Sequence, residues 1–178
     1  GEGVLPDVIT FAGNGEPTSH PHFAEIIDDT ISLRNHYAPN AKVSVLSNST
    51  FLHRPQVVEA LKRVDNNILK IDINMVDRPV GHYDVNAVID SMKAFGGHLI
   101  IQTMFLRGTI DGNDVCNTGD EYVLPWLSAL QEIRPQSVMI YTIDRETPDQ
   151  FLEKASKEEL DAICERVKAL GISCTASY

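Results

Sequence analysis

The amino-acid sequence predicts an α/β fold in which parallel β-strands alternate with crossover helices. Two observations carry this prediction. Apolar runs of strand length return at regular intervals, and the segments between them place apolar residues at the spacing of an amphipathic helix. Apolar runs that are each followed by a helix are typical of a parallel sheet covered by helices. Because crossovers are right-handed, the sheet is either an open doubly wound sheet or an arc of a TIM-barrel-like (β/α) barrel, and the spacing does not choose between them.

Six strands and five helices are expected in alternation. The strands are predicted at residues 8–11, 43–46, 68–73, 99–105, 138–142 and 172–176. The helical patterns run through residues 23–33, 57–64, 85–95, 122–133 and 160–170. Two pairs, Ser156 with Glu159 and Thr118 with Glu121, have the spacing of a capping box at a helix start. Gly171 stands where a left-handed C-cap belongs.

The longest expected loop, residues 107–120, contains Asp111-Gly112-Asn113-Asp114. This run lacks the remaining positions of a calcium loop, so the sequence favours a solvated turn.

Length and charge limit the classes of protein. The 178 residues, of which 43% are hydrophobic, suit a single domain covering residues 1–178. No apolar run approaches the ~20 residues that span a bilayer, and no signal peptide is evident, so a cytoplasmic location is expected. The net charge of −10 disfavours nucleic acid as a partner. Cys116, Cys164 and Cys174 are odd in number and far apart, which predicts neither a disulfide framework nor a CxxC metal site.

The stretch Phe11–Thr18 is predicted to join the first strand to the first helix, and it combines two glycines with a carboxylate. Gly13 and Gly15 permit positive φ, and Asn14 tolerates it. Such a turn lets bare backbone approach a ligand, with Glu16 beside it. A plain loop is the competing interpretation.

Polar residues follow the predicted strands at the edge where ligands of parallel α/β proteins bind. The set comprises Asn14, Gly15, Glu16, Ser47, Asn48, Ser49, Thr50, Asp72, Asn74, Asp77, Gln102, Thr103, Arg107, Tyr141, Thr142, Asp144, Arg145, Ser177 and Tyr178. This chemistry suits a polar organic ligand better than a polyphosphate, because no GxxxxGK[ST] loop is present. Nor is there a GxSxG, HExxH or GxGxxG motif. Each residue alone is explained as a cap or loop tie, and their coincidence over five strand ends favours a binding edge. His20 and His22 could hold a metal, but capping or exposure is the favoured interpretation.

Several of these segments resemble radical SAM enzymes. Gly13-Asn14-Gly15-Glu16-Pro17-Thr18, followed by His20-Pro21, is similar to the GGEP motif of that superfamily's second strand. Ser47-Asn48-Ser49-Thr50 resembles the end of its third strand, often Thr-Asn-Gly or Ser-Asn-Gly, and Lys70-Ile71-Asp72-Ile73-Asn74 resembles its fourth. Residues 142–148 and 154–171 look like the branch of iron-sulfur oxidoreductases.

The resemblance implies a partial (β/α)6 barrel that binds S-adenosylmethionine and a 4Fe-4S cluster. Such an enzyme cleaves the sulfonium by one-electron reduction and removes a hydrogen atom from a substrate, which the sequence does not name. The cofactor-binding residues that the resemblance implies are Asn14, Gly15 and Glu16 at the methionine amino group, Asp72 or Asn74 with Gln102 at the ribose and carboxylate, and Ser47 and Asn48 at the intervening strand end. Asn14 replaces the first glycine of the motif, and Asn74 replaces a common acid.

The chain departs from the family in its cysteines, because the cluster requires a CxxxCxxC loop that is not present. We therefore expect a fragment that lacks the first strand, its helix and the cluster loop, is catalytically silent, and retains no cofactor. Loss of a strand would leave an open sheet edge, at which a homodimer could form. Two alternatives remain at this stage: a non-catalytic α/β binding or interaction domain, and an unrelated α/β enzyme that acts on a carbohydrate through Asp72 and Glu16.

Overall fold

The computed structural model describes residues 4–13, 15–71, 84–143 and 151–178. The predicted site residues Asn14, Asp72, Asn74, Asp77, Asp144 and Arg145 lie outside these ranges.

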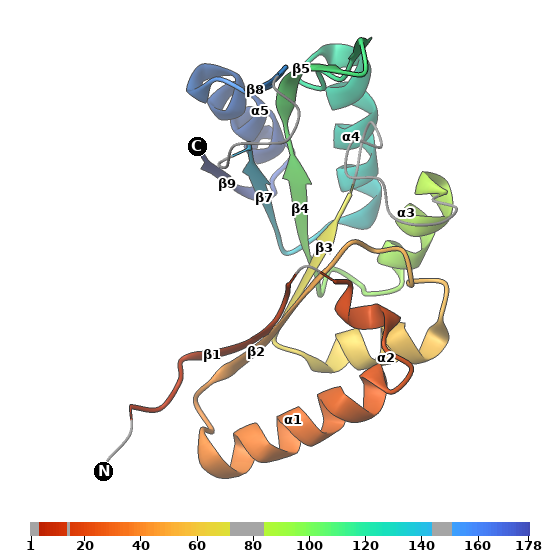
Figure 1. Cartoon of the computed structure of the whole chain (residues 1–178), viewed down its shortest axis with the longest axis vertical. Helices are drawn as coiled ribbons and strands as arrows, with labels where there is room; N and C mark the ends of the chain where they lie inside the picture. Colours follow the sequence, from red (N-terminus) through yellow and green to blue (C-terminus); the bar gives the residue numbers. More distant parts are fainter. Residues whose placement is uncertain (1–3, 14, 72–83, 144–150) are drawn as a thin grey trace.

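A six-stranded parallel sheet forms the centre of the molecule, in the order β1-β2-β3-β4-β7-β9 (Figure 1). Its strands are β1 (Val8–Phe11), β2 (Lys42–Ser47), β3 (Asn66–Lys70), β4 (Ile100–Met104), β7 (Ser137–Tyr141) and β9 (Ser173–Ser177). The strands follow one another across the sheet in chain order, so right-handed crossovers all lie on one face. A doubly wound sheet would reverse its order at a switch point. The fold is therefore an arc of a barrel, and the partial (β/α) barrel is confirmed.

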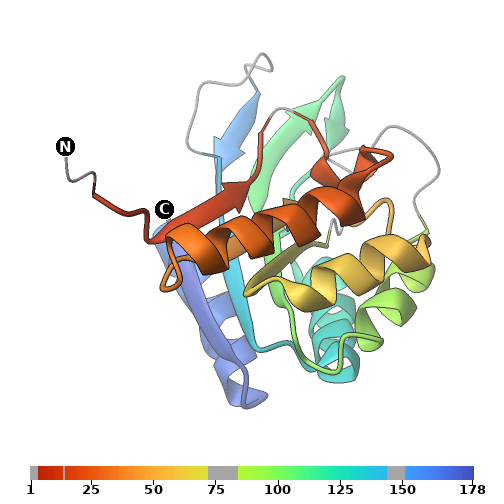
Figure 2. The ribbon, with the colours of Figure 1, turned by 90° about the horizontal axis from the view of Figure 1, so that it is seen from below.

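The helices that connect these strands are α1 (Phe23–Tyr37), α2 (Pro55–Arg63), α3 (Val85–Lys93), α4 (Asp120–Ile133) and α5 (Lys157–Ala169), with a short 3-10 helix η1 (Pro17–Ser19). Figure 2 shows α1 and α2 side by side along the β1–β2 end of the sheet. None of the helices in the described ranges combines the length and the hydrophobicity needed to cross a bilayer.

The core lies between the sheet and the helices because strand side chains alternate between two faces. Leu69, Ile101 and Val138 on neighbouring strands are fully buried against the helical layer. Trp126 of α4 packs edge-to-face on Phe105, with ring centroids 5.2 Å apart. Burying each such side chain is worth roughly 1.5–3 kcal/mol.

One predicted capping box is confirmed and the other is wrong. At α5, the Glu159 N–H donates to Ser156 Oγ at 3.1 Å, and the Ser156 N–H donates to Glu159 Oε2 at 2.8 Å. At α4 the N-cap is Gly119 and no side chain caps the helix. Thr118 Oγ1 donates to Glu159 Oε1 at 3.0 Å, so its hydroxyl ties the loop before α4 to α5 instead. Gly171 adopts the left-handed conformation expected of it, with φ 78°.

The segment predicted as a solvated loop contains a β-hairpin. Strands β5 (Leu106–Ile110) and β6 (Asn113–Asp114) pair with each other, and β8 (Leu152–Lys154) pairs with β5, which gives a small antiparallel sheet in the order β6-β5-β8. Asp111 and Gly112 both have positive φ, 51° and 77°, as a type I′ turn requires. The Asp-Gly pair is a recognised hairpin signal, and the prediction of a plain turn overlooked it.

Candidate functional site

The turns that follow β1 and β2 meet at the carboxyl edge of the sheet. The backbone N–H of Asn48 donates a hydrogen bond to Glu16 Oε2 at 2.7 Å. This bond joins residues far apart in the sequence because β1 and β2 are parallel neighbours whose carboxyl ends emerge together. The glutamate turn and the serine-asparagine turn therefore lie side by side on one edge.

Both carboxylate oxygens of Glu16 are engaged by the protein. The second oxygen, Oε1, accepts from the Thr18 backbone N–H at 3.1 Å and from the Thr18 hydroxyl, so Glu16 is also the N-cap of η1. Charge-assisted bonds of this kind hold a side chain in one orientation. A carboxylate with this bonding suits a positioning role better than that of a general base, which weakens the carbohydrate alternative.

The turn after β2 is held by its own side chains. Ser47 is buried, and its hydroxyl accepts from the Ser49 N–H at 3.0 Å. Asn48 Oδ1 accepts from the Thr50 N–H at 3.0 Å, which closes an Asx turn. Ser47 lies two residues after the buried Val45 and so on the same face of the sheet, which packs into the core, and its side chain shapes the turn rather than the open edge.

Further hydrogen bonds continue the connection from strand end to strand end. Ser49 Oγ donates to the Lys70 carbonyl at 2.7 Å, which joins β2 to β3. The Ile71 N–H donates to the Gln102 carbonyl at 3.2 Å, which joins β3 to β4. The Phe105 N–H, directly after β4, donates to the Tyr141 carbonyl at 2.8 Å, which joins β4 to β7. The carboxyl edge from β1 to β7 is thus one cross-linked rim, positioned before any ligand arrives.

Gln102 presents a buried acceptor just below this rim. The strand register places it level with Lys70 of β3 and Met139 of β7. These residues alternate with buried core residues, so they lie on the face of the sheet opposite the helices. Gln102 Oε1 is buried and has no hydrogen-bond partner among the described residues. A buried acceptor in this state suits a donor group supplied by a ligand or by water.

The glycine turn leaves open space in front of its backbone. A Cβ atom added to Gly13 or Gly15 would meet no atom of the described residues within 4 Å, the chain neighbours aside, and both residues are exposed. The φ of Gly15 is not in the positive range, whereas that of Gly13 is 157°. Among the described residues, none blocks the approach of a ligand to the main chain here.

The three cysteines do not converge on this edge. Cys164 and Cys174 are buried in the core between α5 and β9, and Cys116 lies in the loop between β6 and α4. A 4Fe-4S cluster needs several thiolates on neighbouring irons. The thiols of this chain therefore do not fit such a cluster.

The paired histidines show no metal-binding arrangement. His22 Nδ1 lies 3.1 Å from Glu25 Oε2 on the exposed surface, and the His22 N–H donates to His20 Nδ1 at 3.1 Å. Within residues 4–13, 15–71, 84–143 and 151–178, no three His, Cys, Asp or Glu side chains gather as a metal site would require.

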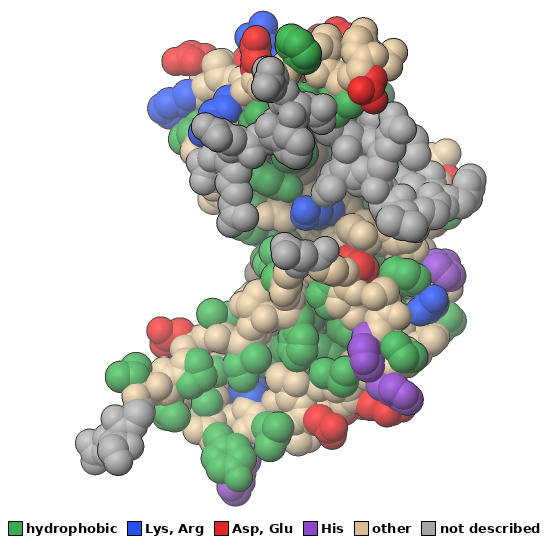
Figure 3. Space-filling view, viewed as in Figure 1, with side chains coloured by type: hydrophobic (Ala, Val, Ile, Leu, Met, Phe, Trp, Pro, Cys, Tyr) green, Lys and Arg blue, Asp and Glu red, His purple; other side chains and the backbone are tan. Residues whose placement is uncertain are grey.

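Two pockets on the helical side are small. One, of about 200 Å³, adjoins the β2 turn and α3, and the other, of about 290 Å³, lies between α3 and α4. Both are below the roughly 300–1,000 Å³ of ordinary small-molecule sites. The open carboxyl edge is therefore the stronger candidate for a nucleoside-sized ligand. On the face drawn in Figure 3, the Lys and Arg side chains are scattered and form no continuous basic patch among the coloured residues.

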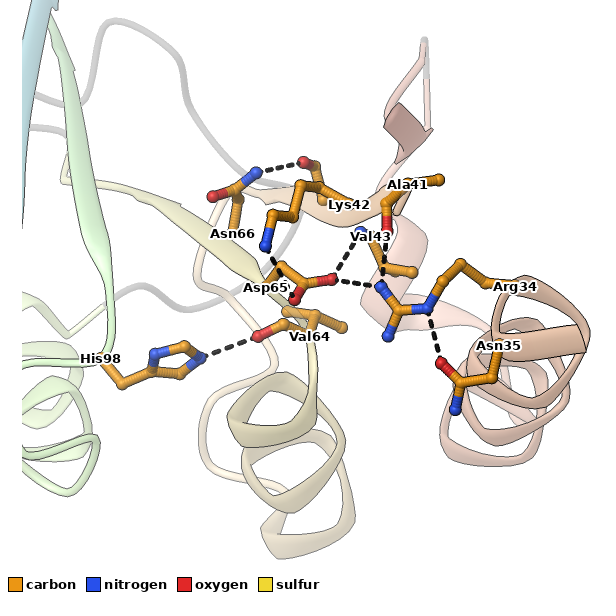
Figure 4. A network of polar contacts seen from close by, with 10 residues as sticks. Arg34, Asn35, Ala41, Lys42, Val43, Val64, Asp65, Asn66 and His98 are labelled. Atoms are coloured by element: carbon orange, nitrogen blue, oxygen red, sulfur yellow. Dashed lines mark hydrogen bonds and ion pairs between the residues drawn. The ribbon is translucent and has the colours of Figure 1, made fainter. Parts of the chain in front are cut away.

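The amino edge of the sheet carries a structural network rather than a site (Figure 4). Asp65 Oδ2 accepts from Arg34 Nη1 and from the Val43 N–H, both at 2.8 Å. His98 Nε2 lies 2.8 Å from the Val64 carbonyl. These contacts tie α1, β2 and the start of β3 together. Burial alone would raise the pKa of Asp65, but the Val43 N–H and the Arg34 guanidinium outweigh it and hold the pKa below its usual range.

The arc of parallel strands has the same fold as solved radical SAM enzymes. A radical SAM methyltransferase from Sphaerobacter thermophilus has a TM-score of 0.68 at 16% identity, covering 97% of this chain and 51% of that chain. A domain of pyruvate-formate lyase-activating enzyme from Bacteroides vulgatus has a TM-score of 0.67 at 15% identity, covering 96% and 98%. Streptococcus suis SuiB bound to S-adenosylmethionine has a TM-score of 0.66 at 13% identity, covering 96% and 39%. At these identities the likeness is one of fold.

Sequence comparison adds a more similar relative. A UPF0026 protein of Helicobacter pylori strain 26695 is 31% identical over 166 residues, which are 86% of this chain and 49% of that protein. The chain thus spans about half the length of this relative. No family model matches the sequence.

Proposed function

We propose that this chain is the S-adenosylmethionine-binding part of a radical SAM oxidoreductase, whose full-length parent cleaves the cofactor reductively and takes a hydrogen atom from a substrate. The observation that carries the proposal is the bond between the Glu16 carboxylate and the Asn48 N–H. It joins the two segments that resemble the second and third strand ends of the superfamily. The SAM-bound neighbour with the same fold supports this assignment.

The described residues that would hold S-adenosylmethionine have distinct roles in this proposal. The open backbone at Gly13 and Gly15 faces the amino-acid part of the ligand. Glu16 and Asn48 position that turn, and Gln102 Oε1, which has no hydrogen-bond partner in the described part of the chain, accepts from a ribose hydroxyl. When bound and reduced by one electron, the sulfonium of the cofactor supplies the hydrogen-abstracting chemistry.

No step through an iron-sulfur cluster is assigned to this chain, because its thiols do not fit one. We expect anaerobic reconstitution with iron and sulfide to leave no metal bound after desalting. Metal and acid-labile sulfide analysis would measure this. About four irons and four sulfides per chain, with charge-transfer absorbance, would contradict the assignment.

A non-catalytic α/β binding domain is the second candidate function. The separation of the three cysteines favours it, since nothing in their placement serves electron transfer. The two candidates differ in their ligand: the oxidoreductase core recognises S-adenosylmethionine at the carboxyl edge, and an unrelated binding domain does not.

Calorimetric titration with millimolar S-adenosylmethionine tests the proposal. We expect weak binding, because the cluster that normally anchors the cofactor does not fit this chain. Gly15→Ala should weaken binding by about tenfold, equivalent to ~1.4 kcal/mol, because the added methyl enters the open space before the turn. Glu16→Gln should weaken it similarly, since an amide cannot accept from all three donors.

Gly171→Ala is the matched control. Gly171 has φ 78° and open space around it. It precedes β9 and so lies at the amino ends of the strands, away from the proposed site at their carboxyl ends. This substitution should lower stability by about 1 kcal/mol and leave binding unchanged. Absence of heat at millimolar cofactor, or equal loss in both glycine variants, would contradict the proposed site.

A further inference from the structure

A pocket of about 290 Å³ lies between α3 and α4, which pack against each other in the helical layer (Figure 1). α4 contributes Pro125, Ser128 and Ala129 to its lining, at the spacing of one helix face. All three side chains are short, so the space between the two helices stays unfilled. The pocket shares no lining residue with the proposed cofactor site, and it is therefore a separate candidate.

The inner wall of the pocket is apolar and is held in one position. Trp126 and Ile71 belong to this wall, and their exposed fractions are only 2% and 4%. Trp126 Nε1 donates to Thr103 Oγ1 at 3.1 Å, and that hydroxyl donates to the Ile71 carbonyl at 3.3 Å. The one polar atom of the indole is thus satisfied inside the protein, so Trp126 offers the pocket apolar ring carbon. A fixed indole ring favours contact with another aromatic ring.

Polar side chains line the open side of the pocket. Asn86, Ser128 and Glu132 belong to the lining and are exposed. Glu132 Oε2 lies 2.6 Å from Lys93 Nζ, so the carboxylate is already paired with a cation. A cationic ligand would have to compete with Lys93, and an anionic ligand would meet the carboxylate. The amide of Asn86 and the hydroxyl of Ser128 are suited to a neutral hydrogen-bonding group.

The volume of the pocket limits the size of its ligand. An apolar cavity of about 150 Å³ is sufficient to bind benzene, whereas sites for drug-sized molecules occupy roughly 300–1,000 Å³. At about 290 Å³ the pocket therefore suits a molecule of one or two rings.

We propose that the pocket between α3 and α4 binds a small neutral aromatic molecule that carries a hydrogen-bonding substituent, as a phenol does. The ring packs among Trp126, Ile71 and Ile89, and the substituent bonds to Asn86 or Ser128 at the open side. Binding here does not depend on recognition of S-adenosylmethionine at the carboxyl edge.

Phenol is the probe for the test, and the indole N–H of Trp126 is the reporter, because the chain has a single tryptophan. Spectra of the ¹⁵N-labelled chain are recorded during titration with phenol. We expect the indole signal to move saturably with a millimolar dissociation constant, since so small a ligand makes few contacts. Benzoate and protonated benzylamine, which carry opposite charges, should each bind at least about tenfold more weakly than phenol.

Ala129→Met fills the pocket from its buried wall, because the flexible methionine side chain adapts to irregular space. This variant should lose the saturable shift and melt at a temperature no lower than that of the unsubstituted chain. Gln131→Met is the matched control, because Gln131 is exposed on the same helix and is not one of the residues that line the pocket. Its affinity for phenol should stay within about twofold of that of the unsubstituted chain.

Three results would overturn the proposal. The first is an indole signal that does not shift saturably at millimolar phenol, and the second is benzoate or protonated benzylamine that binds as tightly as phenol. The third is unchanged phenol binding in a folded Ala129→Met variant. Because the first two measurements need no substitution, they decide the matter even if the methionine variant does not fold.

Discussion

Ser49 occupies a backbone conformation that few residues with side chains adopt. Its φ is 69°, its side chain is fully buried, and its hydroxyl donates to the Lys70 carbonyl. A left-handed residue with a Cβ carries a penalty of roughly 1–2 kcal/mol, which glycine avoids. This explains why the motif that the segment resembles often ends in glycine. In this chain the bond to β3 offsets the strain.

Substitution at Ser49 separates these two effects. Ser49→Ala keeps the strain and loses the hydrogen bond, so it should lower the free energy of unfolding by about 1–2 kcal/mol. Ser49→Gly loses the same bond but relieves the strain, so it should be about 1 kcal/mol more stable than the alanine variant. Urea unfolding measures both. An alanine variant as stable as the glycine variant would show that the left-handed backbone carries no penalty here.

At the residue scale, the sequence identified the polar residues but not their partners. Glu16 and Asn48 could be assigned to strand ends, and their hydrogen bond could not, because it depends on which strands are neighbours. The resemblance assigns Ser47 to the cofactor, and nothing in the motif reveals that its side chain is buried and accepts a hydrogen bond from the Ser49 N–H. That Gln102 Oε1 is buried without a partner among the residues that the structure describes depends on packing that no local pattern encodes.

The small sheet of β5, β6 and β8 depends on Gly108. Its φ is 107°, and a Cβ there would lie 2.0 Å from the Phe151 carbonyl oxygen. Gly108→Ala should therefore disrupt the pairing of β5 with β8 and lower the free energy of unfolding by roughly 2–3 kcal/mol. Gly112→Ala, in the same hairpin but with open space around it, should cost only about 1 kcal/mol. Chemical denaturation of both variants is the measurement, and equal losses would contradict the clash.

The Asp65 network should make stability depend on pH. The pKa of Asp65 is lowered in the folded state, so its contribution is present above the unfolded pKa of about 3.9 and is lost as pH falls through the lower folded value. Asp65→Asn should destabilise the protein by about 1–2 kcal/mol at pH 7, with the difference narrowing below about pH 4.

Asp90→Asn provides the comparison for this prediction. Asp90 pairs with Lys93 at 3.1 Å on the exposed surface of α3. Solvent screens such a pair, so we expect no measurable pH-dependent change in unfolding. An Asp65→Asn difference that stayed constant down to pH 2 would contradict the link to its carboxylate.

At the scale of the element, periodicity predicted strands and helices well because each apolar stripe is local. The strand at Asn66–Lys70 begins earlier than predicted, since Asn66 and Asn67 pair with β2 despite their polarity. The wrong prediction of a capping box at α4 has a tertiary cause, because the Thr118 hydroxyl donates a hydrogen bond to Glu159 of another helix. Capping rules consider one helix at a time and cannot include such a partner.

The open edge at β1 is the feature from which we propose a homodimer. β1 is the first strand of the sheet order, and hydrophobic side chains are exposed along it and on α1 (Figure 3). These are Val4, Leu5, Val8, Leu33 and Tyr37. Asp7 accepts from the Lys42 N–H, so the alternating backbone groups of Val8 and Thr10 face outward.

Thr10→Pro removes one outward donor without touching the β1–β2 ladder, and we expect it to abolish the dimer. Thr10→Ala keeps the donor and should remain dimeric. Light scattering during gel filtration measures the mass of each. If the unsubstituted chain is monomeric at the highest concentration measured, or if the Thr10→Pro variant is dimeric, pairing at this edge is contradicted.

At the scale of the whole molecule, the sequence predicted a parallel α/β fold and left two architectures open. The strand order decided between them, and that order is a long-range property set by how helices and strands pack together. The net charge of the chain and the spacing of its cysteines could not show that the strand ends are tied into one rim.

The central claim is that this rim recognises S-adenosylmethionine. Amide chemical shifts of the ¹⁵N-labelled chain, recorded during titration with the cofactor, test it most directly. We predict that the signals of Gly13, Gly15 and Asn48 and the side-chain amide of Gln102 move together, while those of Asp65 and His98 at the amino edge stay in place. Shifts confined to the amino edge, or no shifts at millimolar cofactor, would contradict the account.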